Sequence, residues 1–197
     1  MSRIEDSLSG LVNVLAEHHP DWIISTPLTG LSDKAVSEIR SALPVGSNEL
    51  MEFLSLYDFK CCDLFPFFDS FPPDEFAKKI TALVQFYNDA NSVFQESFEG
   101  WTSSTLESCK LDSSWRQNWI PIGENNGDYV FVDMDPSELG VPGQIVESHE
   151  DGKYLSVIAS SFSHLLDRIA EKVKEGETQD SGYDDLFLDR IEAHRSE

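Results

Sequence analysis

Positive charge is scarce in this sequence, and so are the cysteine patterns that hold metals or build disulfide frameworks. The 197 residues include 14 Lys and Arg against 36 Asp and Glu, which gives a formal net charge of −22. Such a field repels nucleic acid and anionic membrane surfaces and attracts basic partners, although solubility alone is an equally good reason for it. Cys61, Cys62 and Cys109 form no Cys-x-x-Cys pair of the kind that binds zinc, and free thiols fit a reducing cytosol.

Targeting and membrane-spanning patterns are missing as well. The N-terminal stretch MSRIEDSLSGLVNVL has acidic residues where a signal peptide has a basic start, and no apolar run approaches the length of a membrane span. Hydrophobic residues make up 40% of the chain and aromatic residues 11%, which is enough to form a core. We therefore expect a folded cytoplasmic protein that binds neither membranes nor nucleic acid.

The sequence lacks the usual motifs of catalysis and metal binding. It contains no Gly-x-Ser-x-Gly, no glycine-rich phosphate loop and no basic patch, and its five histidines are scattered. Asp133 and Asp135 stand in an acidic stretch, but without the spacing of an oxygen-ligand loop, so turn chemistry is favoured over a metal. We predict no enzyme, no catalytic residue, no metal and no cofactor, and catalysis by paired carboxylates is the weakest of three hypotheses.

Apolar residues recur at helical spacing in the first half of the chain. The pattern predicts a helix that stops before Pro20 and a second that Ser32 caps and Pro44 ends. A third helix, capped by Ser47, is expected to carry Met51, Leu54 and Tyr57. The phenylalanine-rich run CCDLFPFFDSFPPDEF is expected to start as an extended piece in the core. It should then become a helix with Pro73 in its first position.

Strand patterns follow a long connection over residues 88–117 that has no clear period. The runs WIPIG and YVFVD flank Asn126-Gly127, a strong signal for a tight hairpin, and QIVESH and YLSVIAS flank Asp151-Gly152. Ser160 or Ser161 then caps a helix that ends near Gly176. Helices, a meander of antiparallel or mixed strands and a closing C-terminal helix together predict an α+β fold.

The order of these strings resembles the SMI1/KNR4 family of the SUKH superfamily, over roughly residues 31–170. The most specific part is the series WIPIG, NNGDYVFVDMDP, GVPGQIVESHEDG and IASSFSHLLDRI. Together with the periodicity, the resemblance predicts one SUKH-like domain over residues 1–176. Residues 177–197 would form an acidic tail that is either mobile or a short docked helix. The residues expected to determine the fold are Trp119, Pro121, Gly127, Asp128, Asp133 and Gly143.

The resemblance implies a non-enzymatic binding function. Many bacterial members resemble immunity proteins that neutralise toxins, often nucleases, and fungal members are linked to regulation of cell-wall synthesis and signalling. The leading hypothesis is an antagonist of a cognate bacterial toxin, a basic protein domain that the acidic surface would attract. The alternative is an intracellular scaffold or regulator. Aromatic residues close to acids are the predicted contacts, because such side chains are common at interface hot spots: Asp63, Phe65, Asp69, Tyr183, Asp184 and Asp185.

Overall fold

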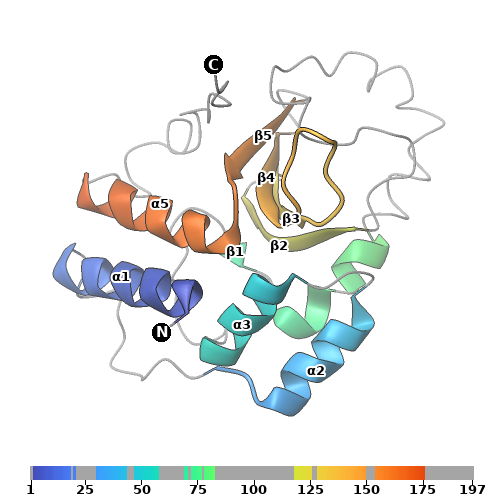
Figure 1. Cartoon of the computed structure of the whole chain (residues 1–197), viewed down its shortest axis with the longest axis horizontal. Helices are drawn as coiled ribbons and strands as arrows, with labels where there is room; N and C mark the ends of the chain where they lie inside the picture. The colour runs from blue at the N-terminus through green and yellow to red at the C-terminus, as the bar shows by residue number, and fades with distance from the viewer. Residues whose placement is uncertain are drawn as a thin grey trace.

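The fold consists of helices on one face of an antiparallel sheet (Figure 1). It is known from a computed structural model, which describes residues 2–18, 20, 30–43, 47–57, 69–70, 72–76, 78–82, 118–125, 128–149 and 154–175. In chain order the elements are α1 (Arg3–His18), α2 (Asp33–Ala42), α3 (Asn48–Leu56), β1 (Asp69–Ser70), η1 (Pro73–Glu75), β2 (Trp119–Asn125), β3 (Asp128–Asp133), β4 (Gln144–His149), β5 (Tyr154–Ala159) and α5 (Phe162–Lys174).

Serine caps begin three of the helices, as the sequence predicts. The hydroxyl of Ser32 accepts the Ala35 N–H at 3.3 Å at the start of α2, and that of Ser47 accepts the Leu50 N–H at 3.2 Å at the start of α3. Of the two candidates for α5, Ser161 is the cap. These side chains satisfy amide groups that have no partner within the helix.

Two helix boundaries differ from the sequence-based expectation. Pro73 does open a helical segment, but its first turn is the 3₁₀ helix η1, in which the Phe76 N–H donates to the Pro73 carbonyl oxygen. Residues 76 and 78–82 then continue as a helix. Tyr57 was expected inside the third helix, but it caps the C-terminus of α3 in extended backbone and is fully buried there. Its burial therefore comes from tertiary packing beyond the end of the helix.

The sheet is a five-stranded antiparallel meander in the order β1-β2-β3-β4-β5, with the two-residue β1 at one edge. Asn125 pairs with Asp128, so β2 and β3 are joined across the predicted turn dipeptide, which itself lies outside the described residues. The pairing of β2 with β3 shifts register between Pro121 and Gly123. The predicted α+β class, with its antiparallel meander and closing helix, is confirmed.

The sheet buries apolar side chains on both faces. One face meets the helices in a core that includes Phe53 of α3 and Phe162 of α5, whose ring centroids lie 4.7 Å apart. Alternate residues of the strands, Val130 and Val132 among them, join this core. Phe131 points to the other face and its ring centroid lies 5.0 Å from that of Trp119.

The two terminal described helices pack against each other. Figure 1 shows α1 in blue alongside α5 in orange. The inward stripe of α1 includes Ile4, Leu8 and Leu11, and Arg3 forms an exposed ion pair with Asp167 at 3.5 Å. Within the described ranges, no helix has the length and apolarity needed to cross a membrane.

Candidate functional site

The predicted contact residues fall almost entirely outside the described part of the chain. This holds for Asp63 and Phe65, and also for Tyr183, Asp184 and Asp185. Of Asp69, the backbone is described: it begins β1, with its Cα opposite that of Glu124 in β2. The proposed role of these six residues in binding therefore stays a prediction.

The strand-end motif around Asp133 forms a buried polar network. The carboxyl group of Asp133 is inaccessible to solvent and accepts two hydrogen bonds. The Asp135 N–H donates to Oδ1 at 3.0 Å, and Nε2 of the buried Gln144 donates to Oδ2 at 3.0 Å. Gln144 lies directly opposite Asp133 in the pairing of β3 with β4. The carboxyl group thus fixes both ends of the chain segment between these strands, because hydrogen bonds to a buried acceptor are costly to lose.

Residues 134–143 form the β3–β4 loop, and further hydrogen bonds hold its backbone in place. The Gly143 N–H donates to the Asp133 carbonyl oxygen at 2.7 Å. Gly143 has a φ of +92°, a left-handed conformation that side chains disfavour, which explains the glycine before Gln144. Gln144 then accepts the Val141 N–H through Oε1 at 3.1 Å and donates its own N–H to the Val141 carbonyl oxygen at 2.9 Å.

The outer part of this loop exposes apolar and acidic side chains. Leu139 is 71% exposed and Val141 55%, and they are the large hydrophobic residues on the surface of the described ranges. Asp135 and Glu138 of the same loop are exposed as well. The Leu139 N–H donates to the Ser137 hydroxyl at 3.2 Å, so the backbone beneath both apolar side chains is bonded. Sequence reasoning missed this pair, because apolar residues in a turn have no periodicity to interpret.

The side chains of Trp119 and Pro121 are buried in β2. Trp119 is 3% exposed and packs against Phe131, so it offers no open face for stacking on a ligand. Pro121 is buried next to the register shift between β2 and β3. Gly127 lies outside the described residues, and Asp128 is described only through its backbone at the start of β3. The fold-determining role of these residues remains an expectation that mutation can test.

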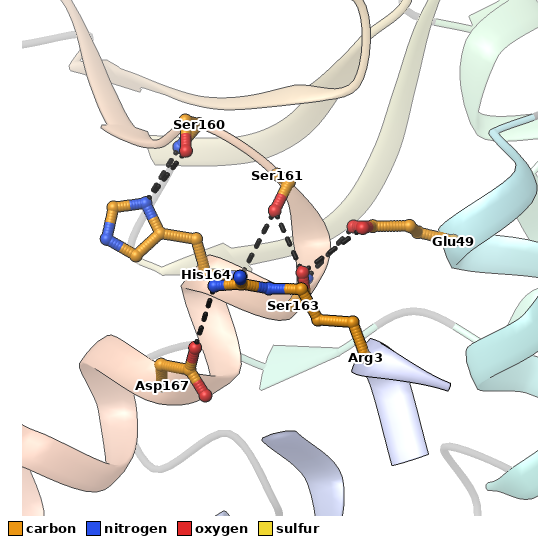
Figure 2. Close-up of polar contacts among 7 residues, drawn as sticks. All are labelled: Arg3, Glu49, Ser160, Ser161, Ser163, His164 and Asp167. Carbon is orange, nitrogen blue, oxygen red and sulfur yellow. Dashed lines mark hydrogen bonds and ion pairs between the residues drawn. The ribbon is translucent and has the colours of Figure 1, made fainter. Parts of the chain in front are cut away.

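A second polar cluster joins α3 to the first turn of α5 (Figure 2). Glu49 accepts the N–H of the fully buried Ser163 at 3.0 Å and its hydroxyl at 3.1 Å. The hydroxyl of Ser161 lies 3.0 Å from that of Ser163 and accepts the His164 N–H at 3.2 Å. A carboxylate at this end of a helix is stabilised by the exposed amides and the helix dipole. The cluster therefore serves as a tether between two helices.

His164 contacts Ser160, the residue before the N-cap of α5. Its Nδ1 accepts the Ser160 N–H at 3.2 Å and lies 3.0 Å from the Ser160 hydroxyl. Partial burial and the nearby charge of Arg168 lower the pKa of His164, which favours the neutral ring that accepts this bond. Glu49 bonds Ser163 and not the histidine ring, so the described contacts do not assemble a nucleophile, base and orienting carboxylate in series.

Metal-ligating residues do not gather in the parts of the chain that the structure describes. Those ranges contain no group of three or more His, Cys, Asp or Glu residues placed to hold a metal ion. The Asp133 carboxyl group, which begins the Asp-x-Asp stretch, has both oxygens engaged in the loop network. Both oxygens thus hold the backbone of the loop and the side chain of Gln144.

Comparison with known proteins places the chain in a family. The model of the SMI1 / KNR4 family (SUKH-1) matches residues 30–168, which is most of the chain, and no curated protein matches. The matched range contains both networks, from Glu49 in α3 to His164 in α5. This family includes immunity proteins, and its domains bind partner proteins. The chain therefore belongs to the SMI1/KNR4 (SUKH-1) family.

Proposed function

We propose that the protein is a non-enzymatic binding domain of the immunity type, which neutralises a cognate bacterial toxin by covering its active site. The family match over residues 30–168 carries this proposal, because that family includes immunity proteins. The described polar clusters support it, since their hydrogen bonds cap helices and fix a loop. Binding alone, without a reaction, is sufficient to block another protein.

The charge of the chain indicates what kind of toxin domain it binds. A nuclease needs a basic groove for its substrate, and a protein of net charge −22 is complementary to such a surface. Electrostatic attraction speeds association by roughly 10- to 1,000-fold at low salt, and the gain fades as salt screens it. The proposed partner is thus a basic protein domain, met in the cytoplasm, and neither a nucleic acid nor a membrane.

Co-expression with the product of the adjacent gene tests the proposal. Cells that make this product alone should stop growing, and cells that also make the acidic protein should grow. The purified pair should associate rapidly at low salt and more slowly above physiological ionic strength, where the screening length is about 8 Å. Growth arrest despite the acidic protein, or association that ignores salt, would refute the toxin-antagonist proposal and favour the scaffold or regulator.

A further inference from the structure

The β3–β4 loop combines exposed apolar side chains with a backbone held in one conformation. Its ends are joined by Asp133 and Gln144, and its middle by bonds to the N–H groups of Leu139 and Val141. An isolated apolar residue on a surface is ordinary and needs no partner to explain it. Here two of them stand two positions apart on a segment that is already ordered in the folded protein. Such a segment loses little conformational entropy on binding, and this preorganisation favours affinity.

The chain on both sides of the loop carries charge of one sign along the sequence. Between Arg116 and Lys153 the chain contains eight acidic residues and neither Lys nor Arg. Within the loop itself, Asp135 and Glu138 are exposed close to Leu139 in the sequence. An apolar centre with an acidic rim is the complement of a shallow apolar pocket bordered by Lys and Arg.

A second copy of the same chain is a poor occupant for this surface. Each copy has a net charge of −22, and the loop would bring its own acidic side chains against another acidic surface. A basic partner, by contrast, gains from both the apolar contact and the charge. The charge of the chain therefore favours a different, basic protein as the partner that binds this loop.

We propose that the β3–β4 loop is the docking element for the basic partner, with Leu139 and Val141 seated in an apolar pocket of that partner and Glu138 at its charged rim. This inference rests on the proposed function and specifies its contact surface. Apolar anchors act mainly on the dissociation rate, whereas rim charges act mainly on the association rate and its salt dependence. The two kinds of side chain should therefore be separable in a kinetic experiment.

The test uses the full chain and the purified, catalytically disabled product of the adjacent gene. The double variant Leu139→Ser/Val141→Ser should raise Kd by about 30-fold or more, mostly through faster dissociation, since hot-spot truncations have effects of this size. Glu138→Gln should slow association at low salt and weaken its salt dependence. The matched control, Glu17→Gln, removes the same charge from an exposed position of α1 and should change association less.

Each outcome distinguishes the docking surface from the function on which it rests. The double variant should remain folded and unfold at the same temperature as the parent, because neither side chain contributes to the core. A thermal unfolding curve checks this. If wild type and double variant bind equally well, the docking inference is wrong and the proposed function stands. If the wild-type protein does not bind the product of the adjacent gene, the docking inference and the proposed function are both wrong. If the double variant instead converts a dimer to a monomer in light scattering, the occupant is a second copy and the basic partner is refuted.

Discussion

Two glycine-to-alanine substitutions should change stability in opposite directions, and Gly30→Ala is the informative one. Gly30 lies just before α2, where the Leu31 N–H donates to the Leu54 carbonyl oxygen at 2.8 Å. A Cβ atom at Gly30 would stand 1.8 Å from the carbonyl oxygen of Ser55 and 2.7 Å from the amide nitrogen of Leu56. These are backbone atoms of the last turn of α3, so no side-chain rotation can relieve the contact.

The size of the effect follows from what must move. Forcing an extra methyl group into filled space costs about 1–3 kcal/mol, and separating the two segments also weakens a hydrogen bond worth about 0.5–1.5 kcal/mol. We therefore expect Gly30→Ala to lower the free energy of unfolding by about 2–4 kcal/mol. For a chain of this length, that corresponds to a fall in Tm of roughly 4–16 °C.

Gly10 provides the matched control. It is exposed in the middle of α1, and a Cβ atom there would meet nothing within 4 Å. Gly10→Ala should raise the free energy of unfolding by about 0.4–1 kcal/mol, because the substitution restricts the unfolded chain and favours the helix. Urea unfolding followed by circular dichroism measures both variants. A Gly30→Ala protein as stable as the parent, or a destabilised Gly10→Ala protein, would refute the reasoning.

The remaining predictions concern the core, the helix tether, one titration and the tail. Trp119→Ala should cost about 3–5 kcal/mol in urea unfolding, and an unchanged midpoint would contradict its anchoring role. Glu49→Ala should cost about 1–3 kcal/mol because the buried N–H and hydroxyl of Ser163 both lose this acceptor. In a Ser163→Ala background the loss should be smaller by the share of the hydroxyl, while the share of the backbone N–H remains. An NMR titration of His164 should give a pKa below 6.5. The folded protein then takes up this proton less readily than the unfolded chain, so stability should fall as the pH drops from about 6.5 toward the pKa of the folded state. Removing residues 177–197 should shift Tm by only a few degrees, and a large loss would place the tail in the core.

Local chemistry explains why so much of the fold was predictable. A serine before an apolar stripe marks a helix start within a few residues, and Asn-Gly between alternating strands marks a hairpin, whatever the rest of the chain does. The choice between Ser160 and Ser161 needed the structure. Both can cap a helix by type, but Ser161 reaches the His164 N–H while Ser160 bonds the histidine ring.

The β3–β4 loop was only half predictable from the sequence. The fold role expected for Asp133 follows from its position at a strand end, but its partner Gln144 is distant in the sequence and becomes adjacent only through the register of β3 and β4. The exposure of Leu139 and Val141 depends on how the whole loop is held, so no local pattern reveals it. The stretch between Arg116 and Lys153, which contains neither Lys nor Arg, was the available signal in the sequence that the loop carries negative charge.

The loop separates the residues that fix its backbone from those that face outward. Asp133, Gly143 and Gln144 hold the conformation through buried bonds and a left-handed backbone, and their replacement should disturb the fold and the loop together. Leu139 and Val141 contribute nothing to the core, so stability places little constraint on their identity. A substitution at either position would change which pocket the loop fits while leaving the scaffold intact. One rigid fold can in this way present different contact chemistry to different basic partners, which is what an antagonist of a specific toxin requires.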